Sequence, residues 1–197
     1  MERPVHVNSR SMSPRAHKRR RRLRAFTLVE LMVVVLLVGI LATIGIVIFR
    51  QWVFHTRSVE AFGMVQSVRV AQERWRAESG SYLDVSTTMT SWYPMPAPGR
   101  TLWDWNQASG ADHGKWMRLN PTVSGPLQFA YVTKAGAPFT AIPAPSTVEQ
   151  PAWPAANAMT QPWYVIQAMG DTDADGVKSY YVAASLTGEI LRENEGE

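Results

Sequence analysis

An uninterrupted apolar segment near the N-terminus constrains this chain more than any other feature. Residues 31–49 contain no charged side chain, and Thr43 is the only residue among these 19 with a hydroxyl group. As a helix they would extend about 28 Å, close to the roughly 30 Å hydrocarbon core of a bilayer. A core helix of a soluble protein would carry a polar stripe, which this segment lacks. We therefore predict that it spans a membrane.

Basic residues flank the N-terminal side of the apolar segment. Seven Lys and Arg residues lie between Arg15 and Arg24, with no acidic residue among them. Because cytoplasmic flanks of membrane helices are rich in Lys and Arg, we expect the N-terminus in the cytoplasm and everything after Arg50 on the outer side. The apolar run exceeds the roughly 7–15 residues of a cleaved secretory signal, and no small-residue cleavage site closes it.

One carboxylate, Glu30, stands at the start of the apolar segment. An ionised carboxylate costs a few kcal/mol at such a position unless it is paired. One interpretation places Glu30 at the level of the lipid headgroups, where the helix dipole favours an anion. The other gives the charge a partner supplied by another molecule.

The residues around Glu30 resemble a known processing motif. Residues 25–34 read Ala-Phe-Thr-Leu-Val-Glu-Leu-Met-Val-Val. With the Gly-Ile-Leu-Ala of residues 39–42, they resemble the N-terminal motif of type IV prepilins and pseudopilins. The resemblance implies that prepilin peptidase cleaves between Ala25 and Phe26 and that the new Phe26 amine is N-methylated. It also implies that Glu30 neutralises the free amino terminus of a neighbouring subunit during assembly, as a buried charge requires.

The chain departs from this family pattern at two positions. Ala25 stands where the family usually has Gly, and Val47 stands where it often has Pro. Ala is small, so we expect processing to survive, and without Pro no kink is expected near residue 47. The leader is long, and Met12 is an alternative start that would leave 14 residues before Phe26.

The charge is divided sharply between the leader and the rest of the chain. Residues 1–25 hold nine Lys/Arg and one acidic residue, a net charge of +8. The remainder has 11 basic and 15 acidic residues, a net charge of −4. Nucleic acid is therefore an unlikely partner, because the basic surplus that phosphate binding needs lies in a segment we expect to be removed. The chain has no cysteine, which excludes disulfide bonds.

Residues 26–79 contain no proline, so we predict a single long helix with two functional halves. Residues 26–51 form its transmembrane and assembly half. Residues 52–79 form an amphipathic half, whose apolar stripe needs a sheet to cover it. The stripe consists of Phe54, Ala61, Met64, Val65, Val68, Ala71 and Trp75. We expect Gly80 to end the helix in the left-handed conformation.

The remaining chain predicts an irregular region followed by a sheet. Residues 80–162 hold 11 of the 13 prolines and five scattered tryptophans, which form either a loop-rich core or an exposed patch. Residues 127–133 are predicted to pair as a short hairpin with residues 139–142. Residues 163–197 are predicted to form an antiparallel meander with strands at 163–169, 179–185 and 189–192. The expected fold is α+β and pilin-like, with the long helix packed on the C-terminal sheet.

Three carboxylates, from Asp171, Asp173 and Asp175, lie within five residues and end at Gly176. A hard divalent cation such as calcium would relieve their mutual repulsion. The loop is not an EF-hand, because Val182 stands where the twelfth-position Glu would be. An ordinary solvated turn is the alternative. The four histidines are dispersed and no nucleophile or phosphate-loop motif is present, so no enzymatic activity is expected.

The resemblance to type IV prepilins and pseudopilins, together with these features, implies a structural subunit of a type IV pilus or pilin-like filament. Its expected partners are other pilin or pseudopilin subunits, prepilin peptidase, an inner-membrane assembly platform and the lipid bilayer. It would sit in the bacterial inner membrane with its C-terminal domain in the periplasm, and then enter an extracellular pilus or a periplasmic pseudopilus. The alternatives are a pseudopilin of a type II secretion system, a minor tip pilin that binds DNA or a surface, and a plain signal-anchored protein.

Overall fold

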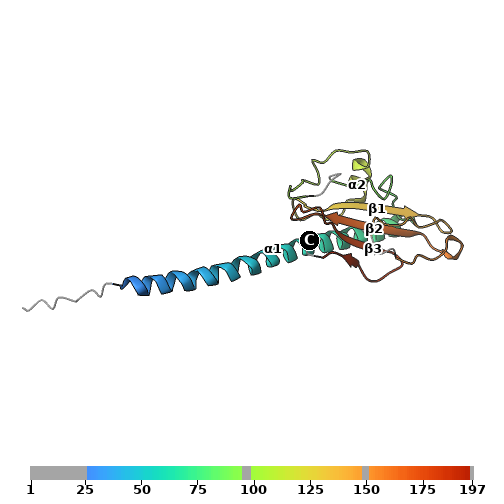
Figure 1. Cartoon of the computed structure of the whole chain (residues 1–197). Helices are drawn as coiled ribbons and strands as arrows, with labels where there is room; N and C mark the ends of the chain where they lie inside the picture. The colour runs from blue at the N-terminus through green and yellow to red at the C-terminus, as the bar shows by residue number, and fades with distance from the viewer. Residues whose placement is uncertain (1–25, 95–98, 148–150, 196–197) are drawn as a thin grey trace, which may run out of the picture. The chain divides into compact units, whose positions relative to one another are not determined.

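The chain has an α+β layout, as predicted, with a long apolar N-terminal helix and a four-stranded antiparallel sheet (Figure 1). The computed structural model describes residues 26–94, 99–147 and 151–195. The chain divides into two compact units, with the boundary between Thr43 and Ile44. The elements are α1 (Leu28–Ser79), α2 (His113–Leu119), β1 (Ala130–Gly136), η1 (Ala156–Ala158), β2 (Trp163–Gly170), β3 (Ser179–Ala184) and β4 (Leu191–Glu193).

The C-terminal half of α1 buries the stripe predicted for it. Its buried side chains belong to one core cluster with β1, β2 and β3, and Trp75 packs against that cluster while half-exposed. The side chain of Phe54 lies outside the described residues. The helix ends where expected, since Gly80 has a φ of 78° and donates its N–H to the Arg76 carbonyl at 2.8 Å. The buried stripe residues are Ala61, Met64, Val65, Val68 and Ala71.

The sheet has the strand order β1-β2-β3-β4, with every neighbouring pair antiparallel. All eight residues of β2 are buried. Alternate residues of β2 belong to different clusters, with Tyr164 and Ile166 in the cluster that includes α1 and Trp163 and Val165 in a second cluster. Because alternate residues point to opposite faces, the sheet is covered by α1 on one side and by loops on the other. Those loops contribute Met89 and Met159, with Trp92, Ile142 and Trp153 packed beside them.

The tryptophans of the middle region are mainly core residues. Trp105 and Trp116 are buried and meet edge to face, with ring centroids 5.0 Å apart. Trp92 and Trp153 are half-buried against the second cluster. Trp103 is the exception, since 38% of it is exposed. The interpretation of these residues as a loop-rich core is therefore confirmed for most of them.

The predicted hairpin between residues 127–133 and residues 139–142 is wrong. The first strand runs from Ala130 to Gly136 and pairs with β2, with Gly136 opposite Trp163. Residues 139–142 form no strand. Residues 137–162 contain six prolines, which lack the N–H that a strand ladder needs. Gly136 serves packing instead, because a Cβ added there would lie 2.3 Å from the Trp163 ring.

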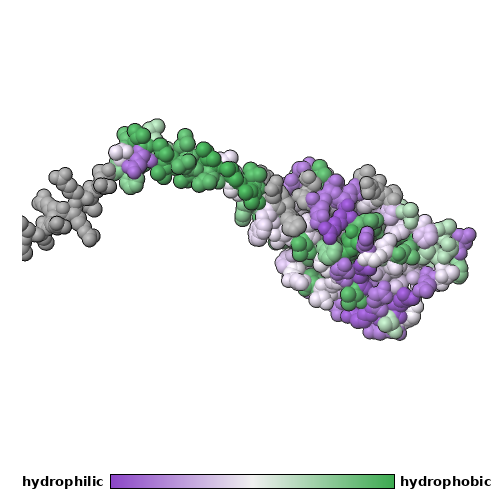
Figure 2. Space-filling view, turned by 90° about the horizontal axis from the view of Figure 1, so that it is seen from below, coloured by the Kyte–Doolittle hydropathy of each residue, from purple (hydrophilic) through white to green (hydrophobic). Residues whose placement is uncertain are grey.

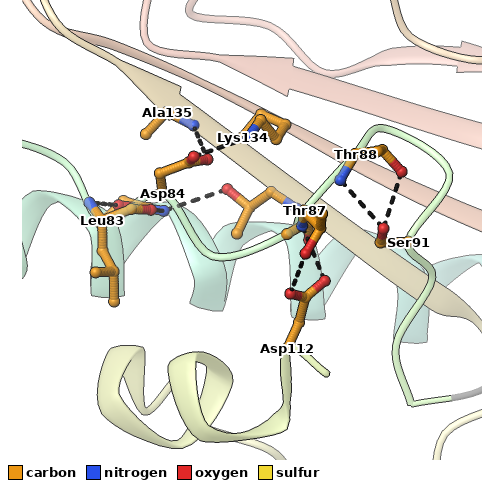
Figure 3. A network of polar contacts seen from close by, with 11 residues as sticks. Leu83, Asp84, Thr87, Thr88, Ser91, Asp112, Lys134 and Ala135 are labelled. Atoms are coloured by element: carbon orange, nitrogen blue, oxygen red, sulfur yellow. Dashed lines mark hydrogen bonds and ion pairs between the residues drawn. The ribbon is translucent and has the colours of Figure 1, made fainter. Parts of the chain in front are cut away.

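The outer edge of β1 is covered by the segment that follows α1 (Figure 3). The Ser86 N–H donates to the Thr133 carbonyl at 3.0 Å, and the Ser86 hydroxyl oxygen accepts the Thr133 N–H at 3.1 Å. Asp84 accepts the Ala135 N–H at 3.1 Å and forms an ion pair with Lys134 at 2.7 Å. Hydrogen bonds and an ion pair thus hold the segment after α1 against β1 in a chain that has no disulfide.

Candidate processing and assembly segment

Helix α1 begins two residues after the proposed N-terminal residue, Phe26. Thr27 caps the helix, because its hydroxyl oxygen accepts the Glu30 N–H at 3.2 Å and its carbonyl accepts the Leu31 N–H at 3.2 Å. Thr27 and Glu30 have the three-residue spacing of a capping box. The same sequence that resembles a processing motif therefore also encodes the start of the helix. Ala25, on the other side of the predicted cleavage point, lies outside the described residues.

Glu30 lies in the first turn of α1 and its side chain is exposed. Within residues 26–94, 99–147 and 151–195, no Lys or Arg forms an ion pair with it. The positive end of the helix dipole favours a carboxylate at this position, whereas the placement of Glu30 at the level of the lipid headgroups stays a prediction. An exposed carboxylate at this position is also accessible to a cation on another molecule.

The first 22 residues of α1, Leu28–Phe49, are long and apolar enough to cross a membrane, and none of that surface is buried within the molecule. Figure 2 shows the hydrophobic colour over this part of the helix. Phe26, just before it, is 71% exposed. An apolar surface this large needs a lipid or protein environment.

The three aspartates of the predicted ion site lie close together in the turn between β2 and β3. One carboxylate oxygen from each of Asp171, Asp173 and Asp175 lies within 4.8 Å of the others. The Asp175 N–H donates to Asp173 at 3.3 Å, and the Val177 N–H donates to Asp175 at 2.7 Å. Such bonds also occur in ordinary Asp-rich turns. The Oδ1 atom of Asp171 is different, because it is buried and accepts no hydrogen bond from the described residues.

Two residues that the sequence did not single out for this region anchor the turn to the rest of the domain. Arg57 of α1 donates to the Thr172 carbonyl at 2.6 Å, and the Gln128 side-chain amide reaches the same oxygen at 3.4 Å. The next charged residue along α1, Glu60, accepts the Gln128 N–H at 2.9 Å. Burial raises the pKa of Glu60 above its ordinary value of 4.5. Arg57 and Glu60 lie off the apolar stripe of α1 or at its edge, and this position was the one signal that the sequence offered for them.

Comparison with known proteins identifies the N-terminal segment. The family model described as the prokaryotic N-terminal methylation motif matches residues 20–46. No curated protein and no solved structure matches the chain. The matched residues include Phe26 and Glu30, together with most of the exposed apolar part of α1. The chain therefore carries the prepilin-type signal of type IV pilins and pseudopilins, which indicates a structural protein of the type IV pilin-like or pseudopilin kind.

Proposed function

We propose that this protein is a structural subunit of a type IV pilus or pilin-like filament. One observation carries the proposal: the methylation motif at residues 20–46 coincides with a capped helix whose apolar surface is unburied from Leu28 to Phe49. Prepilin peptidase would cleave between Ala25 and Phe26, and the new amine of Phe26 would be methylated. The inner membrane would hold the helix until an assembly platform transfers it to the filament.

Apolar burial drives the proposed assembly. Each apolar side chain that leaves lipid or water for a neighbouring helix contributes dispersion contacts, and burial from water adds about 25 cal/mol per Å². Glu30 sets the register of that packing. Glu30 follows Phe26 by four residues and lies in the first turn of α1, and its carboxylate would pair with the positive amino terminus of the adjacent subunit. Opposite charges about 4 Å apart attract strongly where water is excluded.

The test combines intact-mass measurement with an assembly assay. Mass spectrometry of the membrane-purified protein is expected to show a chain that begins at Phe26 and carries one added methyl group. Glu30→Ala is expected to leave the protein in the membrane fraction. Glu78→Ala, which removes an exposed carboxylate at the other end of α1, is the matched control and should assemble normally. An unprocessed N-terminus would contradict the proposed function, and normal assembly of Glu30→Ala would contradict the pairing role.

A pseudopilin of a type II secretion system is the second candidate. The clustered carboxylates of Asp171, Asp173 and Asp175 favour it, because similar Asp-rich turns occur in some secretion pseudopilins, and we propose calcium as their ligand. Deletion of the gene would then block secretion of exoproteins. A minor tip subunit that captures DNA has less support, because residues 26–197 carry a net charge of −4.

A further inference from the structure

Phe139 combines strained backbone with an exposed aromatic ring. It lies in the connection after β1, has a φ of 62° and is 64% exposed. Non-glycine residues rarely adopt this left-handed conformation, because their Cβ is crowded there. Two contacts hold the turn, since Phe139 donates its N–H to Met159 at 2.7 Å and Thr140 accepts a hydrogen bond from the Trp163 indole at 2.9 Å. The fold thus keeps a large apolar side chain in solvent on a fixed support.

A groove of about 580 Å³ lies elsewhere on the same unit, between α1 and residues 120–127. Two of its valines are unusually exposed, Val59 at 60% and Val70 at 69%. Gly63 leaves space between them, because a Cβ added there would meet no atom within 4 Å. Ser67 holds the two walls together through a 2.7 Å hydrogen bond to the Thr122 carbonyl. The apolar lining consists of Val59, Met64, Val70, Ala71, Pro126 and Leu127.

We infer that this groove receives Phe139 from a second copy of the chain. The inference rests on the proposed function, since it names the contact between neighbouring subunits. The groove lies on α1, the helix that also carries the methylation motif, and that motif implies assembly with further subunits. Residues 135–147 contain no charge, so the segment around Phe139 brings no ionised group of its own into the groove, whose charged lining residues are Glu60 and Arg74.

Because the Phe139 ring and the groove lie at different places on one molecule, the same contact can form again with each further copy. Strand β1 runs beside α1, because Gln128 bonds to Glu60 and Thr133 bonds to Gln72. Phe139 follows the far end of β1, whereas the groove begins at Val59. One molecule therefore presents the ring at one place and the groove at another. Such a contact between unlike surfaces leaves both partners able to bind a further copy, which produces an open filament where the rotation between copies does not close into a ring.

Cysteine cross-linking tests the contact directly, because the chain has no native cysteine. Full-length Phe139→Cys and Val70→Cys would be co-produced in cells that assemble the unsubstituted chain, and then oxidised. A disulfide-linked dimer is expected from the mixture and from neither variant alone. Val177→Cys, an exposed residue outside the groove, replaces Phe139→Cys in the control mixture and should give none. Dimers from Phe139→Cys alone, or equal yields with Val177→Cys, would overturn the inference.

A second measurement, the amount of protein in sedimentable filaments without oxidation, shows whether the docking contact or the filament function itself has failed. Filaments without the 139–70 cross-link would overturn the docking contact and leave the filament function intact. Failure of the unsubstituted chain to assemble in its native host would contradict both.

A second pair of variants tests the docking without cross-linking. Phe139→Gly removes the ring and suits the positive φ, so it should not lower the melting temperature while it reduces assembly at least tenfold. Gly63→Leu should fill the groove without a backbone clash and reduce assembly to a similar degree. Gly114→Leu, at an equally open position outside the groove, is its control. Unchanged assembly of Phe139→Gly and Gly63→Leu would refute the contact.

Discussion

Gln72 makes the polar connection between α1, the segment after it and β1, and its removal should destabilise the domain. The side chain is fully buried. Its amide nitrogen donates to the Leu83 carbonyl at 2.9 Å and to the Thr133 hydroxyl at 3.2 Å, and its oxygen accepts the Leu83 N–H at 3.0 Å. Gln72→Ala deletes all three hydrogen bonds. It also leaves the backbone groups of Leu83 without this partner.

The expected loss follows from those contacts. Each hydrogen bond contributes about 0.5–1.5 kcal/mol net, so three give about 1.5–4.5 kcal/mol. Leu83 is half-buried, so water recovers part of the cost at its backbone. Gln72→Met keeps most of the side-chain volume and lacks the amide. If hydrogen bonding dominates, Gln72→Met should lose nearly as much stability as Gln72→Ala.

The assay is guanidinium unfolding of the full chain in mild detergent, followed by fluorescence of the buried Trp105 and Trp116. Gln66→Ala is the control, because Gln66 is only half-buried on the same helix, and its loss should be within about 0.5 kcal/mol. A Gln72→Ala variant as stable as this control would refute the argument. A Gln72→Met variant as stable as the unsubstituted chain would assign the effect to packing.

Three further predictions concern pH, packing and metal binding. Because the pKa of Glu60 is raised above 4.5, the contribution of Glu60 to the free energy of unfolding should fall as the pH rises from 4.5 through the raised pKa. Urea unfolding at a series of pH values should show this decrease in stability in the unsubstituted chain and a smaller one in Glu60→Gln. Gly170→Ala would place a Cβ 2.2 Å from the buried Phe129 ring and should cost about 1–3 kcal/mol in thermal or chemical unfolding, whereas Gly114→Ala, which meets nothing, should be neutral. Calorimetric titration with millimolar calcium should release or absorb heat with the unsubstituted chain and much less with Asp173→Asn; no heat and no thermal shift with the unsubstituted chain would contradict the site.

The processing segment could be predicted because its information is local. The basic flank, the apolar run and the spacing of Phe26 and Glu30 are all consecutive in the chain. Thr27 and Glu30 define the helix start through a hydrogen bond between residues that are three positions apart in the sequence. The buried stripe of α1 was equally accessible, because helical periodicity decides which side chains share a face. The proximity of Asp171, Asp173 and Asp175 also follows from short sequence separation.

Contacts between distant residues were harder to predict. The partner of β1 is β2, 27 residues after Gly136 at the Gly136–Trp163 pair, and the prolines of residues 137–162 are the only local signal against pairing with the nearer residues 139–142. The role of Gly136 depends on the Trp163 ring beside it. Arg57 and Gln72 are not part of the apolar stripe predicted for the helix, and their partners, Thr172 and Thr133, lie far along the chain.

The sequence alone determined a capped apolar helix with a prepilin-type signal and an amphipathic continuation, because hydrophobic periodicity and motif spacing act over a few neighbouring residues. Tertiary structure alone decided which segment closes the edge of β1, how the loops cover the second face of the sheet, and where an exposed Phe139 lies relative to the groove beside Gly63. The physical reason is that many pairings satisfy the same local preferences. The chain selects among them by long-range burial and hydrogen bonding, which only the folded molecule displays.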